Sequence, residues 1–190
     1  MSLLRPVGKI IVINGTSSAG KTTLAAAVQQ TEPELQLLHV QLDAFRAMEP
    51  PGYWAPERKA YSPSRLEALC RAIHNTAAQF ARSGEQVLLD HVLTPTACKY
   101  LLQDLAGYEV LFVKVSCSLK VLERREAERG DRPLGLAKSQ LETVHAGCSY
   151  DLELDTTSEE PAQLARRFAE WLRKSPTSSG FHFMQRANAA

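Results

Sequence analysis

The chain has 190 residues, 44% of them hydrophobic and 23% charged, which is the composition of an ordinary globular protein. The formal net charge of +1 provides no overall basic field to attract nucleic acid, so any phosphate must be bound by a local site. The four cysteines, at 70, 98, 117 and 148, lack the close spacing of a zinc site and are expected to be reduced thiols. The sequence has no signal-like segment and no apolar run near the ~20 residues that span a bilayer, and it predicts a cytoplasmic protein without a membrane partner.

Apolar segments that suit buried parallel strands alternate with amphipathic segments that suit helices. The first strand is predicted at 9–13, where the residues are apolar on both faces. Later strands are predicted at 35–41, 87–90, 110–116 and 150–154, and helices at 21–30, 64–82, 94–105, 118–130, 134–145 and 159–174. This alternation predicts an α/β fold with a five-stranded parallel sheet and helices on both of its faces.

Two segments show neither pattern. Residues 45–63 contain prolines at 50, 51, 56 and 63, which rule out a continuous helix, so this segment is predicted to be irregular. Residues 175–190 are rich in Ser, Gly, Asn and Ala, with a small apolar group at Phe181, Phe183 and Met184, and are predicted to form a mobile tail. The single folded domain is therefore expected to span residues 1–174.

A phosphate-binding motif follows the first predicted strand and opens the first predicted helix. Gly15-Thr-Ser-Ser-Ala-Gly-Lys-Thr22 matches the P-loop pattern G-x-x-x-x-G-K-[ST]. In such a loop backbone N–H groups approach phosphate oxygens, the lysine reaches the β- and γ-phosphates, and the helix N-terminus faces the same anion. The predicted nucleotide-binding residues are Gly15, Thr16, Ser17, Ser18, Ala19, Gly20, Lys21, Thr22 and Thr23.

Two oxygen ligands are predicted for a magnesium ion. The hydroxyl of Thr22 is one, as in other P-loops. Asp90 is the other, because Val87-Leu-Leu-Asp90 is an apolar strand that ends in a carboxylate, the Walker B pattern. The alternative for Asp90 is a carboxylate that caps a turn.

The predicted general base is Asp43, just past the end of the second strand, at the sheet edge where ligands bind in α/β folds. Its alternative role is a helix N-cap in the segment 43–46. The residues after it are rich in aromatic and long side chains, and they suit either the wall of an acceptor pocket or a cover over the sheet. These residues are Phe45, Arg46, Met48, Tyr53, Trp54 and Tyr61.

Residues 123–133 have the composition of a lid, because Arg129 and Arg132 flank Gly130, where a helix is expected to end. Arginines on such an element can close over a triphosphate and stabilise transition-state charge, so both are predicted to be catalytic together with Lys21 and Asp43. The alternative is a solvated helix face with ion pairs such as that of Arg124 with Glu128.

Three further residues follow predicted strands or helices near the same edge. Thr156, after the last strand, is predicted to contact the adenine. His91 and His145 are able to approach the site, but a lone histidine is more often structural.

Taken together, these residues resemble the chloramphenicol phosphotransferase family of P-loop kinases. The resemblance covers about residues 9–173 and is most specific at the P-loop segment 14–22, Asp43, the lid segment 126–132 and the segment 144–157. It implies a nucleotide-kinase-like P-loop NTPase fold, ATP with Mg²⁺, and phosphorylation of a primary hydroxyl, with the base at Asp43 and lid arginines at Arg129 and Arg132. The sequence departs from the family pattern at His91, where members often have a second acidic residue, and in the segment 45–63.

The sequence therefore predicts an ATP-dependent phosphotransferase that acts on a small-molecule hydroxyl acceptor. The acceptor stays open between chloramphenicol and another metabolite, such as a nucleoside or a sugar acid. A second class of function is a nucleotide-dependent switch, which needs neither an acceptor pocket nor a base at Asp43. A nucleic-acid partner is not expected because no basic stripe accompanies the P-loop, and a homo-oligomer stays open.

Overall fold

Five strands form one parallel sheet in the computed structural model, which describes residues 6–50, 63–129 and 134–189. The strands are β1 (Ile10–Asn14), β2 (Leu38–Gln41), β3 (Val87–His91), β4 (Val110–Ser116) and β5 (Leu152–Asp155). Their order across the sheet is β2-β3-β1-β4-β5, and every neighbouring pair is parallel. The predicted five-stranded parallel sheet is confirmed, with the P-loop strand at its centre.

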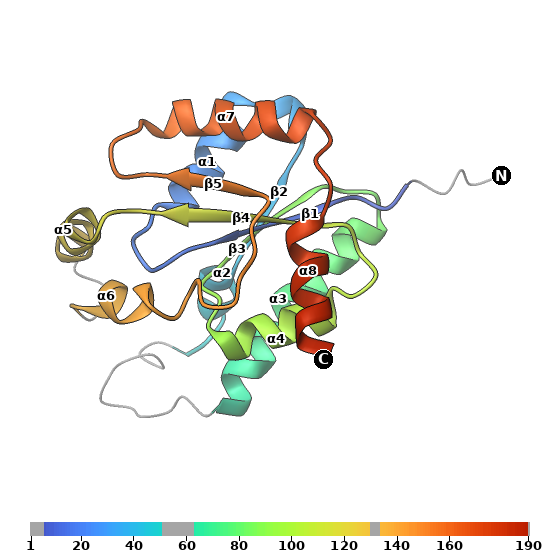
Figure 1. Cartoon of the computed structure of the whole chain (residues 1–190), viewed down its shortest axis with the longest axis horizontal. Coiled ribbons are helices and arrows are strands. Elements are labelled where there is room, and N and C mark those ends of the chain that lie inside the picture. Colours follow the sequence, from blue (N-terminus) through green and yellow to red (C-terminus); the bar gives the residue numbers. More distant parts are fainter. Residues whose placement is uncertain (1–5, 51–62, 130–133, 190) are drawn as a thin grey trace.

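Helices cover both faces of this sheet, as predicted (Figure 1). They are α1 (Lys21–Thr31), the short 3₁₀ helix η1 (Pro33–Leu35), α2 (Leu42–Arg46), α3 (Pro63–Arg82), α4 (Pro95–Asp104), α5 (Leu119–Arg129), α6 (Leu136–Leu141), α7 (Pro161–Arg173) and α8 (Ser179–Ala189). Helices α1 and α7 lie on one face and α3, α4 and α8 on the other, while α5 and α6 lie beyond the carboxyl ends of the strands. No helix among the described residues is both long and apolar enough to cross a membrane.

The central strand β1 is buried on both faces, which explains its uninterrupted apolar sequence. Ile10 and Val12 belong to the core under α3, α4 and α8, whereas Ile11 and Ile13 belong to the core under α1 and α7. All four side chains are fully buried. Strand β1 therefore contributes two side chains to each of the two cores.

Some element boundaries differ from those predicted. Strand β2 begins at Leu38 rather than at 35, because η1 occupies the preceding residues and Gln36 leaves it with a positive φ of 49°. Helix α6 covers only Leu136–Leu141, since Gly135, with φ 85°, starts it late. Helix α4 begins after its cap Thr94, whose Oγ1 accepts a hydrogen bond from Ala97 N at 3.2 Å.

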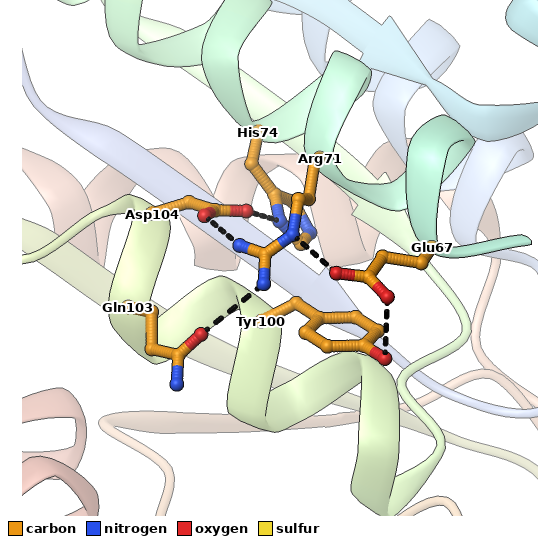
Figure 2. Close-up of polar contacts among 6 residues, drawn as sticks. All are labelled: Glu67, Arg71, His74, Tyr100, Gln103 and Asp104. Carbon is orange, nitrogen blue, oxygen red and sulfur yellow. Dashed lines mark hydrogen bonds and ion pairs between the residues drawn. The ribbon is translucent and has the colours of Figure 1, made fainter. Parts of the chain in front are cut away.

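Helices α3 and α4 are joined by a polar network centred on Arg71 (Figure 2). Its guanidinium donates to Glu67 at 2.8 Å and to Asp104 at 2.5 Å, and it lies over the Tyr100 ring at 4.6 Å from the centroid. The other oxygen of Asp104 is 2.9 Å from Nδ1 of His74, a fully buried side chain on α3. The network therefore fixes both the spacing of the two helices and the orientation of one buried imidazole.

The prediction of a mobile C-terminal tail is wrong for the described residues of that segment. Helix α8 contributes Phe181 and Met184 to the core beside β4, and both side chains are buried. Asp151 holds the first turn of α8, because its Oδ1 accepts hydrogen bonds from Ser179 Oγ and Gly180 N, both at 2.8 Å. Phe181 and Met184 are three positions apart, which places both side chains on one face of α8.

We expect Phe181→Ala to lower the free energy of unfolding by about 3–5 kcal/mol, because it removes a fully buried aromatic ring from the core. Phe183→Ala is the matched control on the same helix, since that side chain is 58% exposed, and it should change stability by less than about 0.5 kcal/mol. Urea unfolding of the full chain measures both. Equal, small effects of the two substitutions would contradict the docked position of α8.

Candidate active site

A cleft of about 570 Å³ opens at the carboxyl ends of the strands, where α/β sheets bind ligands. Its volume falls in the usual range for ligand pockets, roughly 300–1,000 Å³. The P-loop, α2 and the residues after β3 form one part of its wall, and α5, α6, Thr156 and the start of α7 form the other. The cleft therefore collects almost every element on which the sequence placed a site residue.

The P-loop has the backbone geometry that its glycines predict. Gly15 lies so close to β4 that a Cβ there would be 2.2 Å from the Val115 carbonyl oxygen, so no side chain is tolerated. Gly20 precedes α1 with a φ of 88°, a conformation that glycine adopts without strain. Residues 15–19 are buried, and the N-terminus of α1 opens into the cleft.

Lys21 is 7% exposed and its ammonium group is folded back on the loop. Nζ donates to the carbonyl oxygens of Gly15 at 3.0 Å and Thr16 at 2.9 Å. These bonds stabilise a buried cation and keep it at the mouth of the loop, within the cleft.

The two predicted metal ligands are in direct contact. Thr22 Oγ1 donates to Asp90 Oδ2 at 2.7 Å, and the His39 imidazole lies 3.6 Å from the same oxygen. Burial by itself would raise the pKa of Asp90, but His39, the charge of Lys21 and the Thr22 hydroxyl together hold that pKa below its usual value. Asp90 is therefore a carboxylate at neutral pH.

A magnesium ion fits this pair of residues. Hydroxyl and carboxylate oxygens are the donors that Mg²⁺ prefers, and Mg²⁺ bound with a nucleotide usually keeps several waters and few protein ligands. Among the described residues no group of three or more His, Cys, Asp or Glu side chains could hold a metal ion alone. Thr22 and Asp90 would thus share the ion with phosphate oxygens and water.

Asp43 lines the cleft from α2, where its side chain is half exposed. Arg46, one turn later on the same helix, is 3.3 Å from Asp43 Oδ1 and also lines the cleft. The alternative of a helix N-cap is wrong, because the N-cap of α2 is Gln41 and Asp43 lies within its first turn. The structure therefore brings the carboxylate into the same cleft as the P-loop.

The residues after Asp43 divide between the two predicted roles. Phe45 packs against the core and covers the sheet, whereas Met48 is 76% exposed. Arg46 is the one member of the group found in the wall of the cleft among the described residues. Tyr53, Trp54 and Tyr61 lie outside the described residues.

The lid arginines are partly described. Arg129, the last residue of α5, is exposed and lines the cleft, while Arg132 lies outside the described residues. Arg124 forms the ion pair with Glu128 that the spacing predicted, at 3.8 Å, with both side chains 65% exposed. Glu128 also lines the cleft, so this exposed ion pair borders the site.

Arg125 belongs to the cleft face of α5 and was missed by sequence reasoning. It donates to Thr156 Oγ1 at 3.0 Å and to Thr156 O at 2.9 Å, and its Nη1 is 3.6 Å from where a Cβ at Gly20 would lie. Thr156, which was predicted to contact adenine, donates in turn to Ala19 O at 2.7 Å. The available signal was position, because Arg125 shares the inward face of α5 with the buried Leu122 and Glu126.

The segment 144–157 is attached to the P-loop strand by Asn14, the last residue of β1. Its Nδ2 donates to Val144 O and to Tyr150 Oη, both at 2.8 Å, and its Oδ1 accepts from Leu93 N at 3.0 Å. His145 is held by Tyr150, with 2.7 Å between Nδ1 and Oη. His145 is not part of the cleft wall that the described residues form, and its role here is structural.

His91 adjoins the cleft but its ring points into the core between β3 and α3. Neither ring nitrogen has a hydrogen-bond partner among the described residues, and the ring lies 5.4 Å from that of His74. Burial lowers the pKa of His91 to about 3, so the imidazole is neutral. The position at which the resemblance implies a second acidic residue thus holds an uncharged side chain.

Comparison with known proteins shows which family has this sequence and fold. The family model "Chloramphenicol phosphotransferase-like protein" matches residues 8–173. "Putative O-phosphotransferase Rv2636" of Mycobacterium tuberculosis strain H37Rv is 32% identical, in an alignment that covers 95% of this chain and 89% of that protein. The family match therefore includes every described element of the cleft.

Solved structures give the same fold at lower identity. A sugar kinase from Janibacter sp. HTCC2649 has a TM-score of 0.67 and 23% identity, and covers 89% of this chain and 96% of its own. The APS kinase CysC of Mycobacterium tuberculosis, in complex with AMPPNP and APS, has a TM-score of 0.66 and 19% identity, and covers 88% and 99%. The predicted nucleotide-kinase-like P-loop fold is confirmed.

We expect Arg125→Lys to weaken the binding of ATP about tenfold, because lysine lacks the planar two-nitrogen fork with which the guanidinium reaches both Thr156 oxygens beside Gly20. Arg124→Lys is the matched control, since Arg124 is its exposed neighbour on α5 and pairs with Glu128. Isothermal titration calorimetry with ATP measures both variants. Equal affinities for the two would show that Arg125 has no part in nucleotide binding.

Proposed function

The chain belongs to the chloramphenicol phosphotransferase-like family and is a P-loop phosphotransferase, and within this class we propose that it transfers the γ-phosphate of ATP to a hydroxyl group of a small molecule. The observation that carries the proposal is the meeting, in one cleft, of the P-loop, the Thr22–Asp90 pair and Asp43. Phosphoryl transfer requires a donor site and an acceptor site within reach of one reacting group, and one cleft that holds these parts meets this requirement.

The donor side is formed by the P-loop. Its backbone amides and the N-terminus of α1 would hold the phosphates, and Lys21 would exchange its bonds to Gly15 O and Thr16 O for bonds to phosphate oxygens. Arg125 and Thr156 lie beside Gly20 on the α5 side and would position the adenosine end of the nucleotide. Mg²⁺ bound by Thr22 and Asp90 would neutralise part of the phosphate charge.

The acceptor side is formed by α2. Asp43 would accept the proton of the attacking hydroxyl, a general-base role that the place of its half-exposed carboxylate in the wall of the same cleft supports. Arg129, together with Arg132, would stabilise the charge on the phosphoryl group during transfer. These roles need no covalent intermediate, in agreement with catalysis by positioning and electrostatics.

Chloramphenicol is the first acceptor to test, because the matching family is named for it. Other hydroxyl-bearing metabolites, including nucleosides and sugar acids, form the second group. A cytoplasmic location is proposed because that compartment supplies ATP and keeps thiols reduced, and all four cysteines are free.

The deciding experiment incubates the protein with ATP, Mg²⁺ and chloramphenicol, and then with a panel of hydroxyl compounds, and detects the added phosphate by mass spectrometry. Lys21→Ala is the control that should yield no product. A phosphorylated product from the natural chain alone would support the proposal. Tight ATP binding without transfer to any acceptor would favour a nucleotide-dependent switch instead.

We expect Asp43→Asn to lower kcat by about 10²–10⁴-fold, the usual contribution of a general base, while the dissociation constant for ATP changes by less than about twofold. The amide keeps the shape of the carboxylate but cannot accept the hydroxyl proton. Turnover with the best acceptor and calorimetric ATP binding are measured side by side. Unchanged turnover in Asp43→Asn would remove Asp43 from the mechanism.

A further inference from the structure

Helix α6 is anchored firmly beside the P-loop. The carboxylate of Glu126, a residue only 1% exposed, accepts hydrogen bonds from Gly135 N at 2.6 Å and Ala137 N at 2.9 Å. These bonds satisfy backbone donors at the start of α6, which the helix itself leaves without partners. The side chains on the next turn of α6 are therefore presented to the cleft from a fixed backbone.

Gln140 is one of those side chains, and the structure gives its amide a single orientation. Ser17 N lies 2.7 Å from Gln140 Oε1. A backbone N–H can only donate, so the oxygen of the amide must face the loop and the NH₂ group must face away from it. Gln140 lines the cleft, and its Nε2 makes no hydrogen bond with any residue in the described part of the chain.

The peptide group that Gln140 contacts also contacts Lys21. The Thr16–Ser17 peptide is a rigid plane, whose carbonyl oxygen accepts from Lys21 Nζ at 2.9 Å and whose N–H donates to Gln140. The same peptide group therefore holds both the Gln140 amide and the Lys21 ammonium group, and in a P-loop this lysine reaches the β- and γ-phosphates. Gln140 thereby holds an oriented pair of neutral N–H donors in the phosphate half of the cleft.

We propose that Gln140 is a catalytic residue that donates a hydrogen bond from Nε2 to the γ-phosphoryl group of ATP, and so distinguishes ATP from ADP. Donors that are fixed before the reaction stabilise charge without reorganisation. The inference rests on the proposed function in its choice of ATP, but nucleotide binding tests it without any acceptor.

The test separates this role from a structural one. Gln140→Glu keeps an oxygen that can accept the Ser17 N–H, but replaces the NH₂ group with a negatively charged oxygen. Gln140→Met keeps the length of the side chain and removes both polar groups. Lys138→Gln, an exposed position on the same helix and outside the cleft wall, is the control for the change of one unit of charge.

Calorimetry with Mg²⁺ and either ADP or the non-hydrolysable analogue AMPPNP is expected to show selective loss of AMPPNP binding. The ratio of the two dissociation constants should change about tenfold in Gln140→Met, because the γ-phosphoryl group loses a hydrogen-bond donor. It should change about a hundredfold in Gln140→Glu, because the γ-phosphoryl group also meets a like charge. Lys138→Gln should leave the ratio within about twofold.

Two outcomes would overturn the proposal. One is a ratio of the ADP and AMPPNP dissociation constants in Gln140→Glu that equals the ratio in the unsubstituted chain, which would leave Gln140 as a support for Ser17. The other is an equal loss of both nucleotides in Gln140→Met and Gln140→Glu, which would indicate a general distortion of the P-loop. Neither outcome depends on phosphate transfer, so failure of this inference is distinguishable from failure of the proposed function.

Discussion

The arrangement of the cleft depends on the buried amide of Asn14 at the end of the central strand. Its oxygen and nitrogen connect the chain after β3, the end of the α6 segment and the approach to β5 at one point, directly before the P-loop begins. A buried amide that is satisfied by three partners stabilises one arrangement, since any shift leaves a polar group without a bond. The metal side, the lid side and the phosphate loop are thereby held in one frame.

Local sequence pattern was sufficient for the features that depend on neighbouring residues. The apolar strand 9–13, the P-loop after it and the carboxylate at Asp90 each carry their signal within a few positions, and the parallel sheet follows from their alternation with helices. The Thr22–Asp90 contact could be expected because parallel strands end at one edge. Asp43 and Arg129 were predicted from their places after a strand and at the end of a helix, and the resemblance to a family implies the same roles.

The missed features depend on contacts between distant segments. Gln140 and Ser17 are 123 positions apart, and no pattern near either residue predicts that they meet. Arg125 was overlooked because it is one of several arginines in 123–133, and only the packing of α5 decides which of them faces the cleft. The helix α8 was overlooked because two core residues are too few to outweigh a polar composition, although they bury completely against β4.

The position of α8 shows that the folded unit extends past the segment that the family model matches. The family match ends at residue 173, yet the hydrophobic core continues beyond it into Phe181 and Met184. A relative without this segment must cover the same side of β4 with another element, such as a neighbouring domain or a second subunit.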